Sequence, residues 1–173
     1  MIGRLAAGAA VSLMLWSRCA AADPPAPVAA PGPPDIEGAT AMLQLFNADV
    51  KPTVKNNLVY LNVVTTPGRT QLVYVSPGVY GLAYALAREV SANVVKFTGP
   101  VDPALLQRLM VENDRMLPSA SWALTPGKDG GQYLVLEAFL PTNASADMVQ
   151  QAVKYVALTA DTLEAELTGK DDF

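Results

Sequence analysis

The chain contains no histidine and a single cysteine, Cys19, among its 173 residues. Serine and cysteine hydrolases normally need an imidazole base, and zinc sites in proteins draw mainly on histidine and cysteine. These absences exclude the common triad and zinc chemistries, and they leave carboxylate-only catalysis as the enzymatic alternative. One cysteine also excludes an intramolecular disulfide, so we expect a hydrophobic core to hold the fold. We predict no cofactor and no metal.

Charged residues are scarce and mostly acidic, with 12 lysines and arginines against 16 aspartates and glutamates. Nucleic acids and anionic membrane surfaces are bound through a basic footprint, which this composition does not provide. We therefore expect neither as a partner. A protein partner or a homodimer is the expected association.

The first 22 residues have the three parts of a secretory signal peptide. Arg4 gives a short positive region, residues 5–16 are almost entirely apolar, and alanines at 20–22 suit a signal peptidase. The apolar run, about 12 residues, is shorter than the roughly 20 that span a bilayer, so we predict cleavage rather than a membrane anchor. Lipidation of Cys19 is an alternative, but Arg18 stands where that motif needs a small residue. We predict a periplasmic or secreted protein.

A proline-rich segment follows at residues 23–35. Such a composition favours polyproline II and has too little apolar bulk to fold, so we predict a spacer, with a proline-rich ligand as the alternative. The predicted organisation is a signal peptide at 1–22, a linker at 23–35 and a single domain at 36–173. Removal of the signal takes Arg4, Arg18 and the only cysteine, leaving ten basic residues against 16 acidic ones.

Hydrophobic periodicity predicts an α+β fold whose order is helix, three strands, helix, two strands, helix. Helix starts are indicated by Asp35, by Asp102-Pro103 and by Asn143 or Ser145, and Gly169 indicates the last helix end. The third strand, within 85–95, is ambiguous because alanines there also suit a helix. The expected segments are a helix at 36–48, strands at 58–64, 70–76, 85–95, 121–125 and 133–140, and helices from 102 and from 145.

The two later helices are predicted to be amphipathic. In the middle helix, Leu105, Leu106, Leu109, Met110, Asn113 and Met116 share one face, and in the last helix Val149, Ala152, Val153, Val156, Ala160, Leu163 and Leu167 do so. Acidic residues are expected on the solvated faces, namely Glu112, Asp114, Asp161 and Glu164.

Asn113 is a polar residue on the apolar face of its helix. A buried amide needs hydrogen-bond partners, so we predict that Asn113 binds backbone groups of the nearby strand or hairpin. A ligand contact is the alternative.

Strand alternation predicts a tyrosine-rich face on the sheet. Tyr133 and Glu137 point the same way in the last strand, Tyr60 and Asn62 share a face in the first, and Tyr74 lies in the second. Tyrosines combine an apolar body with a polar tip and are favoured where a surface meets a partner. We predict a partner-binding face at these five residues. Coverage of that face by a helix of the domain is the alternative.

The segment order and several residue patterns resemble the YbjN family, which shares its fold with the type III secretion chaperones. The pattern comprises Leu106, Leu109 and Asn113 on the middle helix, then Trp122-Ala123-Leu124, a glycine-rich turn, Leu134-Val135-Leu136, Leu140-Pro141 and Ala160-Asp161-x-Leu163, with Arg88-Glu89-Val90-Ser91 as the third-strand segment. The resemblance implies an antiparallel five-stranded sheet packed with three helices, a structural role for Trp122, and often a homodimer. Secretion chaperones are cytosolic, so the predicted signal peptide does not agree with the resemblance to the chaperones.

The sequence therefore predicts an exported, non-enzymatic protein-binding or regulatory module. A carboxylate-based hydrolase acting on envelope glycans is one alternative, and it requires two acidic residues lining one cleft. A purely structural envelope protein is the other.

Overall fold

The computed structural model describes residues 33–49, 51–82, 85–117 and 119–173. The predicted signal peptide and the linker up to residue 32 lie outside these ranges. None of the described helices combines the length and apolar character needed to cross a bilayer. The elements are α1 (Ile36–Phe46), β1 (Thr53–Lys55), β2 (Leu58–Thr66), β3 (Arg69–Val75), β4 (Tyr80–Leu82), β5 (Ala85–Phe97), α2 (Pro103–Asn113), β6 (Ala120–Pro126), β7 (Gln132–Pro141) and α3 (Ala146–Thr168).

The strands form one antiparallel sheet in the order β1-β2-β3-β5-β7-β6, with β4 paired to β5. The predicted α+β class, with three helices and an antiparallel sheet, is confirmed, and β5 contains the ambiguous third strand. The predicted count of five strands is wrong, because β1 and β4 add two. Each of these is only three residues long, too short to show alternation, and β1 turns into β2 through Asn56 and Asn57, both with positive φ.

Side chains and a glycine mark the helix ends as the sequence indicated. Asp35 accepts a hydrogen bond from Gly38 N at 2.9 Å, and Asp102 accepts one from Ala104 N at 2.9 Å. At α3 the cap is Ser145 rather than Asn143, and Gly169 ends the helix with a φ of 66°. These contacts satisfy backbone groups that a helix leaves without partners at its ends.

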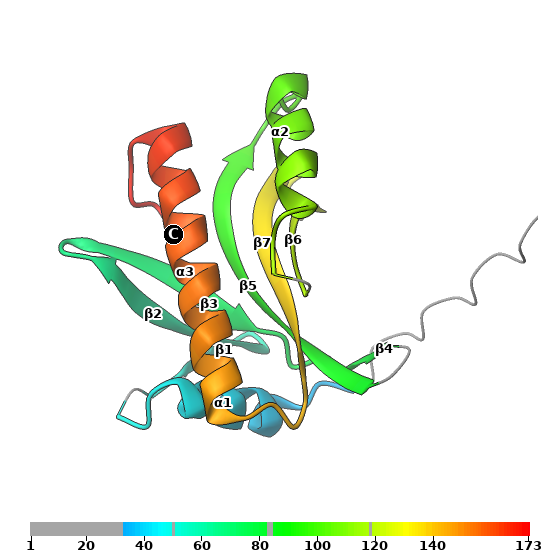
Figure 1. Cartoon of the computed structure of the whole chain (residues 1–173), viewed down its shortest axis with the longest axis vertical. Helices are drawn as coiled ribbons and strands as arrows, with labels where there is room; N and C mark the ends of the chain where they lie inside the picture. The colour runs from blue at the N-terminus through cyan, green and yellow to red at the C-terminus, as the bar shows by residue number, and fades with distance from the viewer. Residues whose placement is uncertain (1–32, 50, 83–84, 118) are drawn as a thin grey trace, which may run out of the picture.

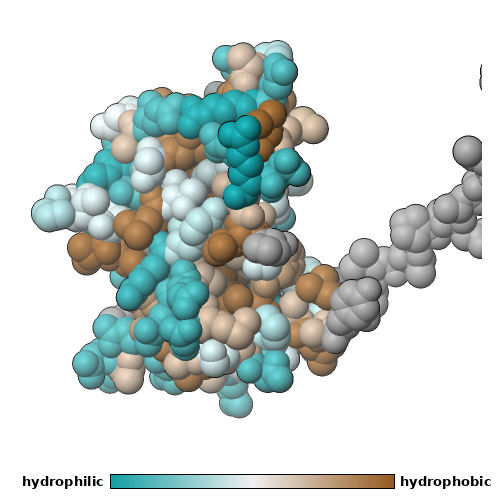
Figure 2. Space-filling view, viewed as in Figure 1, coloured by the Kyte–Doolittle hydropathy of each residue, from teal (hydrophilic) through white to brown (hydrophobic). Residues whose placement is uncertain are grey.

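The three helices pack against one side of the sheet, with α3 crossing β2, β3, β5 and β7 and α2 standing over β6 (Figure 1). The predicted apolar stripe of α3 is buried from Val149 to Leu163, and only Leu167 is partly exposed. On the short α2 only Leu109 is buried, and Met110 is 74% exposed, so the predicted apolar face of that helix is too wide. The reason is that α2 stands at the end of the sheet, where its main contact with a strand is the one with β6. Hydrophilic and apolar residues are interspersed on this helix-bearing side (Figure 2).

The expectation that Asp161 and Glu164 lie on the solvated face of the last helix is wrong. They are 4% and 0% exposed, because the β2–β3 hairpin and the C-terminal residues pack around this end of α3. Arg69 Nε donates to Asp161 Oδ1 at 2.7 Å, and Thr65 Oγ1 donates to Asp161 Oδ2 at 2.8 Å. Glu164 Oε1 accepts from Asp172 N at 2.6 Å. Burial raises the pKa of Glu164 despite this hydrogen bond and the nearby arginine.

The sheet has two halves, β1-β2-β3 and β5-β7-β6, and a short stretch of pairing between β3 and β5, here called the joint, connects them. Strands β3 and β5 are paired at Tyr74–Ser91 and Val75–Val90, whereas β5 and β7 pair from Ala87 to Phe97. Further along, where β3 and β5 are no longer paired, the fully buried Gln71 donates from Nε2 to Asn93 O at 2.8 Å. One side chain thus replaces part of a missing backbone ladder.

Candidate functional site

The side of the sheet opposite the helices carries a row of side chains that crosses five strands. Tyr60 on β2 is opposite Tyr74 on β3, Tyr74 is opposite Ser91 on β5, Ser91 is opposite Glu137 on β7, and Glu137 is opposite Ser121 on β6. Among the described residues the helices all pack on the other side. We call this side the open face and define it by this row and its neighbours.

The two tyrosines of the row form an aromatic pair. The ring centroids of Tyr60 and Tyr74 are 5.6 Å apart with an interplanar angle of 48°, and both residues are half-buried. Burial raises the pKa of Tyr74, and Tyr60 and Tyr133 add to the effect. The Tyr74 hydroxyl is therefore a neutral hydrogen-bonding group at any physiological pH.

The other predicted residues of the face lie further from the row. Tyr133 is opposite Lys96, whose ammonium lies 5.7 Å from the Tyr133 ring centroid, and the C-terminal Phe173 meets the same ring edge-on at 6.4 Å. Asn62 is exposed on β2. The structure therefore places Tyr60, Tyr74 and Glu137 in one row, with Tyr133 and Asn62 at its margins.

Two carboxylates, Glu89 on β5 and Glu137 on β7, are diagonal neighbours on the open face, because Ser91 is opposite Glu137 and Glu89 is opposite Phe139. Glu137 accepts from Ser121 Oγ at 3.3 Å, and Glu89 accepts from the Tyr80 hydroxyl at 3.5 Å. Burial, followed by the charge of Glu89, raises the pKa of Glu137. Within the described ranges neither carboxylate forms an ion pair. Sequence reasoning missed Glu89, although alternation with Ser91 along β5 is the signal that places it on this face.

A groove of about 300 Å³ is lined by one of these carboxylates, Glu89, and by Ser91, the residue opposite Glu137. Its walls combine apolar surfaces with polar groups from several strands, and its lining includes Leu58, Tyr74, Ser76, Glu89, Ser91, Asn93 and Val135. Such a mixture of apolar walls and a few convergent polar groups is typical of binding sites.

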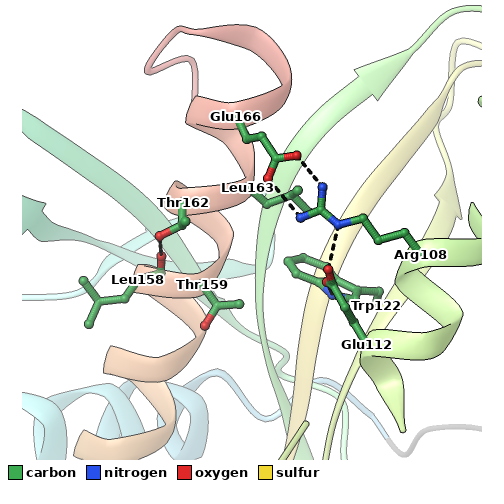
Figure 3. Close-up of a pocket in the computed structure, with 8 residues that line it drawn as sticks. All are labelled: Arg108, Glu112, Trp122, Leu158, Thr159, Thr162, Leu163 and Glu166. Atoms are coloured by element: carbon green, nitrogen blue, oxygen red, sulfur yellow. Dashed lines mark hydrogen bonds and ion pairs between the residues drawn. The ribbon is translucent and has the colours of Figure 1, made fainter. Parts of the chain in front are cut away.

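A second groove, of about 310 Å³, lies between α2 and α3 on the helix-bearing side (Figure 3). Arg108 from α2 reaches across it, donates from Nη2 to Glu166 Oε2 at 2.9 Å, and binds Glu112 through Nε at 2.7 Å. Glu112 in turn accepts from Trp122 Nε1 at 3.0 Å. The charges in this groove are satisfied by one another, so it serves to fasten α2 to α3 and β6.

Asn113 lies next to this network, at the end of α2. Its Oδ1 accepts from Trp122 N at 2.7 Å, and its Nδ2 donates to Trp122 O at 3.2 Å. The amide thereby occupies the free edge of β6 as a neighbouring strand would, and Trp122, which is 7% exposed, belongs to the core. Both residues have structural positions in this arrangement.

Asp161, Glu164 and Asp171 are the described acidic residues whose grouping has the dimensions of a metal site. Their ligand oxygens lie within 4.8 Å of one another. Arg69 lies among them, with Nη2 at 2.6 Å from Asp161 Oδ1 and at 3.9 Å from oxygens of Glu164 and Asp171. Because the guanidinium already supplies the positive charge, the group is organised as an ion-pair network that ties β3 to α3 and the C-terminus.

No protein-family model, curated protein or solved structure matches this chain. The resemblance to the YbjN family thus stays a prediction drawn from the sequence patterns, and the open face is the candidate site on its geometry alone.

Proposed function

We propose that this chain is an exported, non-enzymatic module that binds a protein partner through the open face. The observation that carries the proposal is the cross-strand row containing Tyr60, Tyr74, Ser91 and Glu137, on a side to which the described helices contribute nothing. Half-buried tyrosines with free polar tips give a rigid, amphipathic contact area, and interfaces are enriched in them.

The proposed setting combines the predicted signal peptide with the predicted fold family. The chain would act in the periplasm or outside the cell, and the fold would be of the YbjN and type III secretion chaperone type. Chaperones of that fold type bind proteins, which agrees with a sheet face that no described helix covers. A regulatory role would follow from the partner that the face captures.

The test of this proposal compares capture by the natural protein with capture by a Tyr60→Ala/Tyr74→Ala variant. We expect crosslinking in intact cells to retain a specific protein on the natural chain and to lose most of it on the variant. The matched control is Met148→Ala/Leu158→Ala, which removes exposed apolar side chains from α3 on the other side. Unchanged capture by a folded Tyr60→Ala/Tyr74→Ala variant would contradict the proposal.

Light scattering on the purified protein separates a foreign partner from a second copy. A dimer that the two tyrosine substitutions convert to a monomer would make the partner a second copy, as the family resemblance suggests. We expect instead that the two tyrosine substitutions leave the molar mass measured by light scattering unchanged, because no second copy contacts the open face.

A carboxylate-based hydrolase is the second candidate, and one observation favours it. Glu89 lines a groove, Glu137 is its diagonal neighbour on the next strand, and the pKa of Glu137 is raised, as in glycosidases that use an acid and a base. Release of reducing sugars from purified envelope glycans, abolished by Glu137→Gln, would establish it. We expect no release.

A further inference from the structure

The two carboxylates of the open face differ from the other acidic residues that are buried or half-buried. Glu112 lies 2.7 Å from Arg108, Asp161 lies 2.6 Å from Arg69, and Glu164 lies 3.9 Å from the same arginine. Glu89 and Glu137 are also half-buried, yet no described lysine or arginine pairs with either. Two neighbouring negative charges without a cation are unfavourable, so this site is electrostatically incomplete.

The surroundings of the pair suit a cationic side chain with an aliphatic stem. The groove beside Glu89 offers the apolar surfaces of Leu58 and Val135 for the stem and the ring of Tyr74 for contact with a cation. Ser91, which lies between Glu89 and Asn93 along β5 and opposite Glu137, adds a hydroxyl at the centre. A lysine or arginine placed here has a charge partner, hydrogen-bond acceptors and a wall for its methylenes.

Charge also argues against a second copy of the chain as the occupant of this site. In a symmetric face-to-face dimer the same patch is buried on both copies, so Glu89 and Glu137 of each copy would share one interface to which the cross-strand row brings no lysine or arginine. Like charges brought together in an interface are destabilising. The chemistry of the face therefore favours a partner of opposite charge.

We propose that the partner inserts a lysine or arginine side chain, flanked by apolar residues, against Glu89 and Glu137 on the open face. This inference rests on the proposed function and specifies the chemistry of the partner. The contact supplies the cation that these two carboxylates lack within the described chain, and the Tyr60–Tyr74 pair supplies the adjoining apolar contact.

The test uses a positional-scanning library of short extended peptides in which one position is fixed in turn as lysine, arginine, norleucine, glutamine or glutamate. We expect the natural protein to prefer lysine or arginine over norleucine by about tenfold in Kd, because norleucine keeps the aliphatic stem and lacks the charge. In a Glu89→Gln/Glu137→Gln variant the preference should disappear. The matched control, Glu37→Gln/Asp114→Asn, removes two exposed charges elsewhere and should keep it.

The outcomes separate this inference from the proposed function. Equal affinity of the natural protein for lysine and norleucine peptides would overturn the inference, as would a preference that survives in Glu89→Gln/Glu137→Gln. If no library peptide binds while Tyr60→Ala/Tyr74→Ala still abolishes capture in cells, the cationic contact is refuted and the proposed function stands. If the Tyr60→Ala/Tyr74→Ala variant keeps both peptide binding and capture in cells, the open face is refuted as the binding site.

Discussion

Replacing Asn113 by alanine should loosen the attachment of α2 to the edge of the sheet. The substitution removes both hydrogen bonds between the amide and the Trp122 backbone, at 2.7 Å and 3.2 Å. Because β6 is the last strand of the sheet, no other strand can take over these two backbone groups. The edge then offers an unpaired N–H and C=O, which water satisfies only in part beside a buried tryptophan.

The magnitude follows from these contacts. Two hydrogen bonds contribute about 2 kcal/mol, at roughly 1 kcal/mol each, to the free energy of unfolding. Alanine recovers about 0.5 kcal/mol through its higher helix propensity at the end of α2. The net loss is therefore about 1.5 kcal/mol, which at a urea m-value of about 1.5 kcal/mol/M moves the midpoint down by about 1 M.

Urea unfolding monitored by tryptophan fluorescence measures this change directly. Trp122 is the one tryptophan after residue 22, so the signal comes from the strand that the amide holds. Gln107→Ala, at an exposed position of the same helix, is the control and should leave the midpoint in place. A midpoint shift below about 0.3 M in Asn113→Ala, at unchanged m-value, would refute the strand-like role of the amide.

Two further predictions concern the open face and the core. Burial raises the pKa of Glu137, so the folded protein binds a proton there more readily than the unfolded chain, and this residue destabilises the fold above its folded pKa. Glu137→Gln should therefore raise the urea midpoint at pH 7.5, with the difference from the natural protein narrowing as the pH falls toward the ordinary carboxyl value; a constant or reversed difference would contradict the assigned cause. Leu43 is fully buried between α1 and the rest of the core, and Leu43→Ala should cost about 3 kcal/mol in the same assay, whereas exposed Leu45→Ala should cost well under 1 kcal/mol. A loss of stability in Leu43→Ala as small as that expected for Leu45→Ala would show that α1 contributes little to the core.

Much of the fold could be predicted from periodicity and helix caps because both are local signals. The sequence predicts the apolar stripe of α3, the caps at Asp35 and Asp102, and the shared face of Tyr133 and Glu137, whereas for α3 it offers both Asn143 and Ser145 as the cap. It does not predict the two short strands, because three residues carry no period. β5 was ambiguous because the alanines at its beginning also favour a helix.

The sequence predicts which residues of one strand share a face, but it does not predict how the strands align to form the candidate site. Alternation assigns Tyr60 and Tyr74 to faces of their own strands, whereas the row depends on the register of β3 against β5. The same limit applies to Asp161 and Glu164. Their burial depends on Arg69, which lies 92 residues before Asp161, and on C-terminal residues that fold back onto α3. Such long-range contacts leave no periodic trace in the sequence.

The short joint between β3 and β5 links recognition to folding. The Tyr74–Ser91 pair belongs both to the joint and to the row on the open face, so the surface offered to a partner spans the place where backbone pairing between the two halves is shortest. Local opening of a fold tends to occur where its backbone hydrogen bonds are fewest. A partner that contacts both Tyr74 on β3 and Glu137 on β7 would bind the two halves of the sheet to each other across the joint. By mass action, part of the binding free energy would then appear as resistance to separation of the two halves.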